Sequence, residues 1–141
     1  MKRLYKFFRL SLTDQLLLMR SAVLLGIIKA GLWIVPFQRM CAFLSKIKKS
    51  RNNKVQIPSG RITWAVAVAN RYVVAASCLP TAMTTHILLA KCGHLSCLRI
   101  GVARSEDGEI AAHAWVESCG RIVIGNLPDI SRYVMLPPIT I

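Results

Sequence analysis

The side chains able to do covalent chemistry lie mostly in the second half of the chain. Residues 62–141 hold four of the five cysteines and all three histidines. Catalysis by a cysteine nucleophile needs an ionisable thiol, a histidine within hydrogen-bond reach and a third group that orients the histidine. Cys78 is the best placed thiol, because it precedes Leu79 and Pro80 at the start of a predicted helix. Unpaired N–H groups and the helix dipole favour the thiolate at that position.

The position of Cys78 also selects among the histidines. His86 is eight residues further along the same predicted helix, about 12 Å of rise away, so it cannot act as the base. His94 lies beyond the far end of that helix. The remaining candidate is His113. It lies in a predicted strand with alternating inward and outward side chains, and a polar histidine at an inward position suggests a specific role. We therefore predict that His113 is the general base.

A third catalytic group can be sought by counting outward from a hairpin turn. A two-residue turn at Cys119 and Gly120 places His113 opposite Asn126 on the next strand. Directly opposed side chains have Cβ atoms about 4.5–5.5 Å apart, within reach of a hydrogen bond to the imidazole. The result is a Cys–His–Asn set of the papain kind. The alternative third member is Asp129, three residues later.

The cysteines and histidines also allow a metal site. Cys92, His94 and Cys97 offer three soft ligands close together, and Cys119 or His113 could be the fourth. Their spacing differs from the paired Cys-x-x-Cys pattern of zinc sites, so we expect neither a metal nor a cofactor. Cys41 lies in an apolar helix and is most simply a core residue.

Four helices are predicted before the strands. Ser11 and Asp14 form a capping box that begins a long helix ending near Leu32, and Pro36 can begin the next. Ser59 can cap a third helix, in which Trp64, Val68 and Ala69 share a face. That third helix is predicted over Arg61–Val73, and the fourth over Cys78–Cys92, with Gly93 just beyond its end.

Three strands are predicted after the helices. Asp107 and Gly108 lie in the polar loop between the first two, and the tight turn between the last two places Ser118 opposite Arg121. Helices followed by an antiparallel meander are typical of an α+β fold. The predicted strands are Leu95–Ala103, Ile110–Glu117 and Ile122–Asn126.

Charge divides the chain into two parts. The net charge of the 141 residues is +13, and residues 1–61 carry thirteen Lys and Arg against one acid, Asp14. We expect a basic, apolar helical segment over 1–56 and a catalytic domain over 57–141, with a basic linker in Lys46–Gly60. An apolar fraction of 54% excludes disorder and fibrous classes.

Cysteine usage and hydropathy bear on the location of the protein. Five cysteines are an odd number, and no small-residue cleavage site follows the first apolar run, so a reducing cytoplasm is expected. Leu16–Phe37 is long enough to cross a bilayer, but Arg20 and Lys29 lie about 180° apart on it. Each would cost about 2.5–3.5 kcal/mol near the midplane, so an interfacial or core-covering helix is favoured over a spanning one.

Four stretches of the chain, in order, resemble a known family. They are Trp64–Ala69, Cys78–Ala82, Ile100–Ala103 and Ala112–Glu117, the last reading Ala-His-Ala-Trp-Val-Glu. The chain is similar to the leader-cleaving cysteine peptidases of lasso-peptide biosynthesis, which belong to the transglutaminase-like superfamily. The similarity covers about 61–136, over half of the chain.

The resemblance implies the activity, site and partners of the chain. It implies a Cys–His–Asp/Asn peptidase that removes the leader of a ribosomally made precursor before a separate asparagine-synthetase-like enzyme cyclises it. It assigns Cys78 as nucleophile and His113 as base, in a transglutaminase- or papain-like core where the catalytic helix packs on a small antiparallel sheet. The third residue of the family is usually an Asp about a dozen positions after the His. The third role here is open between Asn126 and Asp129.

Family members of this length lack a fused leader-recognition domain and rely on a small PqqD-like protein. We therefore expect that partner as well as the precursor peptide, with the cyclase as a further partner. Residues 1–56 are candidates for peripheral membrane contact, and no nucleic acid is expected. The alternative class is a non-enzymatic, basic protein that binds a membrane surface or nucleic acid.

Overall fold

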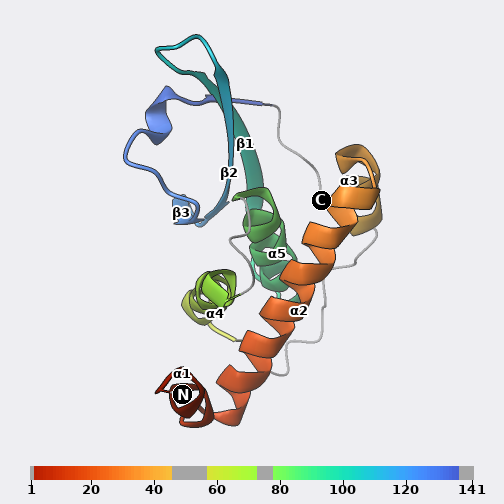
Figure 1. Ribbon diagram of the computed structural model, residues 1–141, viewed down its shortest axis with the longest axis vertical. Coiled ribbons are helices and arrows are strands. Elements are labelled where there is room, and N and C mark those ends of the chain that lie inside the picture. The colour runs from red at the N-terminus through yellow and green to blue at the C-terminus, as the bar shows by residue number, and fades with distance from the viewer. Residues whose placement is uncertain (1, 46–56, 73–77, 137–141) are drawn as a thin grey trace.

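The computed structural model of the chain describes residues 2–45, 57–72 and 78–136. Within these ranges α-helices come first and a small sheet follows (Figure 1), which confirms the predicted α+β class. The helices are α1 (Lys2–Phe8), α2 (Leu12–Ile34), α3 (Phe37–Ser45), α4 (Ser59–Tyr72) and α5 (Cys78–Lys91). The strands are β1 (Cys97–Arg104), β2 (Ile110–Ser118), β3 (Arg121–Ile124) and β4 (Val134–Met135), with a 3-10 helix η1 (Ile130–Arg132) before β4.

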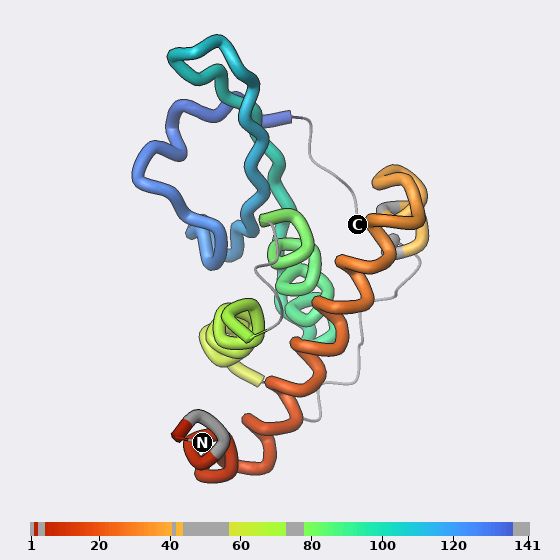
Figure 2. The backbone as a smooth tube through the Cα atoms, viewed as in Figure 1, coloured from red at the N-terminus to blue at the C-terminus, as the bar shows by residue number. Residues whose placement is uncertain are grey.

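The four strands form one antiparallel sheet in the order β3-β2-β1-β4. β2 and β3 are joined at Cys119 and Gly120, whose φ angles are 52° and 76°. Two successive positive φ angles define the type I′ turn, whose twist matches that of the strands. The predicted hairpin is confirmed, with Ser118 opposite Arg121. Figure 2 shows the chain leaving β3 in a wide loop and returning to the far side of β1 as β4, a strand that the sequence did not predict.

The β2–β3 ladder is irregular beyond the turn. Its register shifts by one residue of β3 between Val116 and Glu117, and the strand then ends because Gly125 has a φ of +84° and turns the chain away. The predicted pairing of His113 with Asn126 is therefore wrong. The outward count assumed a regular ladder, and the bulge moves every later residue of β3 out of that register.

Helix α5 lies at the centre of the fold, between the sheet and α2 (Figure 1). Residues 78–90 contain no Lys, Arg, Asp or Glu, and the helix is buried on all sides from Ala82 to Leu89. A helix without a charged face is expected in a core rather than on a surface. It packs on β1 and β2 on one side and on α2 and α4 on the other. Gly93, with a φ of +82°, follows its end as predicted.

The N-terminal helices share this core. Leu17, Leu18 and Ile28 of α2 belong to the same hydrophobic cluster as residues of α4 and α5. The predicted boundary lies between residues 56 and 57. Most of the predicted linker, residues 46–56, lies outside the described residues. The division of the chain into two parts therefore stays a prediction. Helix α4 begins at Ser59, two residues before the predicted start.

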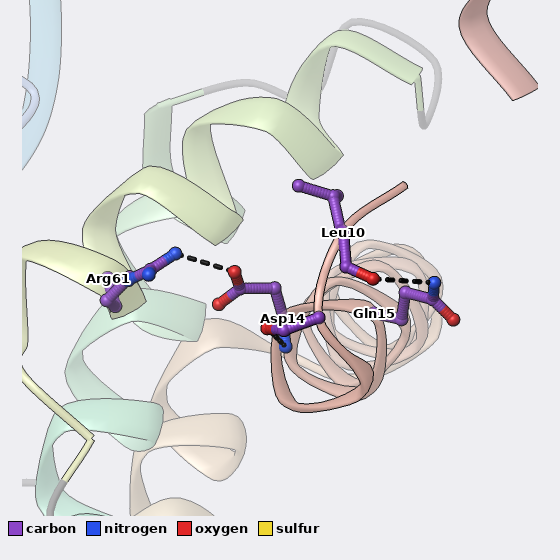
Figure 3. A network of polar contacts seen from close by, with 5 residues as sticks. Leu10, Asp14, Gln15 and Arg61 are labelled. Atoms are coloured by element: carbon purple, nitrogen blue, oxygen red, sulfur yellow. Dashed lines mark hydrogen bonds and ion pairs between the residues drawn. The ribbon is translucent and has the colours of Figure 1, made fainter. Parts of the chain in front are cut away.

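The long helix α2 begins as predicted, and its capping aspartate has a further role. Ser11 Oγ accepts a bond from the Asp14 backbone N–H at 3.3 Å. The Asp14 carboxylate turns to α4, where it pairs with Arg61 at 2.6 Å (Figure 3). Gln15 beside it donates to the Leu10 carbonyl at 3.0 Å, which holds the end of the α1–α2 connection. The Asp14–Arg61 pair joins α2 to α4, whose paired residues are 47 positions apart in the sequence.

Helix α2 is also long and apolar enough to cross a membrane by length and composition. Core helices of soluble proteins and signal sequences meet the same criterion. In the structure one face of α2 is buried against α4 and α5, as expected of a core-covering helix.

Candidate active site

Cys78 is the first residue of α5, as predicted, and it lines a pocket of about 280 Å³. The pocket lies between the C-terminal part of α4, the start of α5 and the edge of the sheet. The Cys78 thiol is free, and the residue is half-buried. The other lining residues are Ala67, Asn70, Arg71, Thr81, Ala82, Ala114, Ile124 and Gly125.

His113 lies beside this pocket, on the other face of the sheet. Its neighbour Ala114 lines the pocket, and successive side chains of a strand point to opposite faces. The His113 ring contacts Trp115, with ring centroids 6.2 Å apart, and Tyr133, at 5.8 Å. Within the described part of the chain, no hydrogen bond joins the imidazole to the Cys78 thiol. The structure thus brings the two residues to the same sheet edge without direct contact.

Gly125 connects His113 to the pocket. The imidazole Nε2 lies 2.6 Å from the Gly125 carbonyl oxygen, and Gly125 itself lines the pocket that contains Cys78. A carbonyl oxygen only accepts hydrogen bonds, so Nε2 carries the proton and donates it. In the neutral ring, Nδ1 then holds the lone pair. The bond therefore selects the tautomer in which Nδ1 can act as a base.

Only glycine fits at position 125. A Cβ there would lie 2.8 Å from the Ala114 carbonyl oxygen and 2.9 Å from the Trp115 Cβ, and the φ of +84° is unfavourable for any side chain. The close approach to β2 is what brings the Gly125 carbonyl within reach of His113.

The two residues predicted for the third role lie elsewhere. Asn126 is exposed, directly after Gly125. Asp129 pairs with Arg132 at 3.3 Å, and both side chains are about half exposed. Neither side chain forms a hydrogen bond with His113, and the backbone of Gly125 occupies the position that orients the imidazole.

Asn70 of α4 is a site residue that the sequence did not single out. It lines the Cys78 pocket, and its Oδ1 is buried and has no hydrogen-bond partner among the described residues. Buried polar groups in proteins are nearly always paired, so an unpaired amide oxygen in the pocket that contains the Cys78 thiol is notable. An isolated asparagine in a helix gives no local signal, because its surroundings depend on how α4 packs near α5.

A model of the transglutaminase-like superfamily matches residues 22–136, which is more than half of the chain. The chain belongs to the transglutaminase-like superfamily. Members of this superfamily are generally cysteine peptidases or acyltransferases. Comparison with curated proteins and with solved structures gave no significant match. The matched region of this transglutaminase-like chain includes most of α2 and extends through β4, so it contains Cys78, Asn70 and His113.

The other histidines of this transglutaminase-like chain are held away from the pocket. His86, in the buried middle of α5, bonds through Nδ1 to Ser96 Oγ at 2.7 Å. His94 bonds through Nε2 to the Ile57 carbonyl at 2.7 Å. In the part of the chain that the structure describes, no three Cys, His, Asp or Glu side chains are grouped closely enough to hold a metal ion.

The remaining described thiols differ from Cys78 in their surroundings. Burial raises the pKa of the Cys92 thiol, and the positive charge of Arg20 partly opposes this effect. Cys97 is half-buried in β1, and Cys119 is exposed in the hairpin turn. The side chain of Cys41 in α3 lies outside the described residues.

A larger pocket, of about 700 Å³, lies between α1, α2 and α4. Trp64, Val68 and Ala69 line it, so these three residues do share a face, as predicted, although Trp64 is partly exposed there. Its described lining contains no thiol and no imidazole, so these residues offer no nucleophile.

Proposed function

We propose that the chain is a cysteine peptidase in which Cys78 is the nucleophile and His113 the general base. The observation that supports this most is the bond from His113 Nε2 to the Gly125 carbonyl, because Gly125 lines the pocket of Cys78. His86 bonds to Ser96 and His94 to the Ile57 carbonyl, and neither Ser96 nor Ile57 belongs to the described lining of that pocket. Membership of the transglutaminase-like superfamily agrees with a thiol nucleophile at the start of α5.

In the reaction, His113 Nδ1 takes the thiol proton and the Cys78 sulfur attacks the carbonyl carbon of the scissile peptide bond. The tetrahedral intermediate collapses as the C–N bond breaks, and the imidazolium gives its proton to the leaving amine. The N-terminal fragment is now a thioester on Cys78. Water, deprotonated by His113, attacks the thioester, and the released thiolate regains the proton. One water molecule is consumed for each bond cleaved.

Catalysis requires His113 Nδ1 to come within hydrogen-bond distance of the thiol. The described ladder of β3 includes only residues 116–118 of β2, so no strand pairs with that edge of β2 beside His113 and Ala114. The Gly125 segment lies against this edge without pairing as a strand, so the imidazole reaches the thiol only if that segment or the His113 side chain moves. Catalytic hydrogen bonds are often long in structures without substrate and shorten when substrate binds.

Two groups are suited to stabilise the oxyanion. The first is the backbone N–H of Cys78, at the N-terminus of α5, where it has no partner within the helix. The second is the side-chain amide of Asn70, which lines the same pocket and whose Nδ2 carries two N–H donors. Removal of one such donor typically lowers kcat about 10²–10³-fold. Asn70→Ala should therefore slow peptide cleavage to that extent while leaving the alkylation rate of Cys78 unchanged. Cleavage at the wild-type rate would remove Asn70 from the site.

The substrate that we propose is the leader region of a lasso-peptide precursor in the cytoplasm. The order and identity of the four stretches from Trp64 to Glu117 support it, because they resemble the leader peptidases of that biosynthesis. A small PqqD-like protein would present the leader, and an asparagine-synthetase-like cyclase would act on the freed core peptide.

Mass spectrometry of the reaction tests the function. A lasso-peptide precursor is incubated with the protein and a PqqD-like partner. We expect two fragments whose masses add up to the precursor plus one water. Cys78→Ala and His113→Ala should abolish both fragments while folding normally by circular dichroism. Unchanged cleavage by either variant would rule out the role given to that residue.

A further inference from the structure

Helix α2 has an apolar face that no described part of the chain covers. The face buried against α4 and α5 includes Leu17, Ser21, Leu25 and Ile28. On the opposite side lies a second line of apolar residues, each at least half exposed. We call these the α2 stripe: Leu12, Leu16, Met19, Val23, Ile27 and Ile34.

The α2 stripe is straight and narrow. At 100° per residue its members fall within about 80° of the helix circumference, and from Leu12 to Ile34 they extend about 33 Å. Steps of three, four and seven residues keep the stripe on one side of a straight helix. A contiguous exposed apolar line of this size is unusual on a soluble monomer and marks an interaction surface.

Aromatic side chains are exposed on α2 and on its neighbours in sequence, α1 and α3. Trp33 is 88% exposed near the end of α2, Phe8 of α1 is 72% exposed, and Phe43 of α3 is 66% exposed. Tyr5 of α1 is also exposed, and the Arg9 guanidinium lies 5.1 Å from the centre of its ring. Aromatic rings with nearby cations are suited to the boundary between water and lipid.

The charge on this part of the surface has one sign. Asp14 is the only acidic residue in positions 1–61, and its side chain is 11% exposed and paired with Arg61. The described helices α1–α3 therefore expose no carboxylate. They do expose five basic side chains: Lys2, Lys6, Arg9, Arg20 and Arg39.

We propose that α1–α3 bind the surface of an anionic membrane, with the α2 stripe lying in the interface parallel to the bilayer. Apolar contact and attraction of basic residues to anionic lipid act together in such binding. A second copy of the chain would bring two surfaces of like charge together, so the charges favour a lipid surface. A spanning α2 would leave its contacts with α4 and α5 and break the Asp14–Arg61 pair, so the helix lies on the membrane.

Vesicle co-sedimentation with the full chain tests this docking. The vesicles contain equal parts of phosphatidylglycerol and phosphatidylcholine, with pure phosphatidylcholine vesicles as the comparison. The test variant is Val23→Glu with Ile27→Glu, both in the α2 stripe. The matched control is Leu95→Glu with Ile110→Glu, which are 73% and 71% exposed and lie outside α1–α3. Both double variants remove two exposed aliphatic side chains and change the net charge by the same amount.

We expect the stripe variant to lose at least about tenfold in binding to the anionic vesicles, and the control to lose less than about threefold. Raising NaCl from about 0.1 to 1 M, which shortens the Debye length from about 10 to 3 Å, should also weaken binding. Equal losses in the two variants, or equal binding to both vesicle types, would overturn the proposal. So would retention of the protein on vesicles after alkaline carbonate washing, which indicates a spanning helix. Urea unfolding of both variants shows whether each is folded, and the result does not depend on peptidase activity.

Discussion

The close approach of Gly125 to β2 can be tested by adding a single methyl group. In Gly125→Ala the new Cβ would lie 2.8 Å from the Ala114 carbonyl oxygen and 2.9 Å from the Trp115 Cβ, closer than side-chain carbons normally approach. Neither contact is with the free end of a flexible side chain. The segment after β3 must therefore shift, and the bond between His113 Nε2 and the Gly125 carbonyl should lengthen or break.

The size of the effect follows from two separate terms. A left-handed φ costs an alanine about 1–2 kcal/mol relative to glycine. Forcing an extra carbon into a filled space typically costs about 1–3 kcal/mol. Together they should lower the free energy of unfolding by about 2–5 kcal/mol. The packing cost arises only where other atoms lie close to the new Cβ.

Gly120→Ala is the matched control. Gly120 has a φ of +76°, almost the same as Gly125, but a Cβ there would meet nothing within 4 Å. We expect this variant to lose only about 1–2 kcal/mol, from the backbone term alone. Urea unfolding followed by circular dichroism measures both, and the difference between them isolates the contact with β2.

Peptide cleavage should separate the two variants as well. Gly125→Ala should slow leader cleavage because His113 loses its orienting partner, whereas Gly120→Ala should cleave at nearly the wild-type rate. If the two variants lose the same stability and the same activity, position 125 does not hold His113 by close contact, and the orienting role of its carbonyl is refuted.

Three further predictions concern other residues. Iodoacetamide near neutral pH should label Cys78 far faster than the other four cysteines. Because burial raises the pKa of the Cys92 thiol, labelling of Cys92 should increase only at higher pH. Equal labelling rates at Cys78 and Cys92, measured by peptide mapping, would contradict this prediction. Arg61→Ala should lower the free energy of unfolding by about 1–2 kcal/mol, because it leaves the 11% exposed Asp14 carboxylate unpaired. Arg132→Ala frees the 47% exposed Asp129 and should change the free energy of unfolding by less than about 0.5 kcal/mol in the same urea experiment. A larger loss in Arg132→Ala than in Arg61→Ala would contradict the role given to the Asp14–Arg61 pair. Asn126→Ala and Asp129→Ala should both keep near-wild-type cleavage rates, since neither side chain bonds to His113, and a large loss in one of them would identify that residue as the third catalytic group.

The features that the sequence predicted well depend on local signals. Ser11 caps α2, Cys78 begins α5, Gly93 follows its end, and the turn at Cys119 and Gly120 has the two positive φ angles that short hairpins favour. Each signal acts over a few residues. Their positions could therefore be read without knowledge of the tertiary structure, and the α+β class followed from their order.

The features that it missed depend on packing between distant segments. The bulge between Val116 and Glu117 has no marker in β2, yet it moves Asn126 out of register with His113. Gly125 was the visible clue, since a glycine inside a predicted strand often marks a bulge or a close backbone approach. The place of Asn70 beside Cys78 depends on how α4 packs near α5. The choice of Cys78 and His113 rested on elimination and resemblance, and it stays a prediction.

The most direct test of Cys78 as the nucleophile is the mass spectrum of the precursor peptide after incubation with the protein and its PqqD-like partner. With the wild-type chain, we expect the precursor to be replaced by a leader fragment and a core fragment whose masses add up to the precursor plus one water. With folded Cys78→Ala protein, we expect the precursor alone. Cleavage by Cys78→Ala at the wild-type rate would contradict the assignment of Cys78 as the nucleophile.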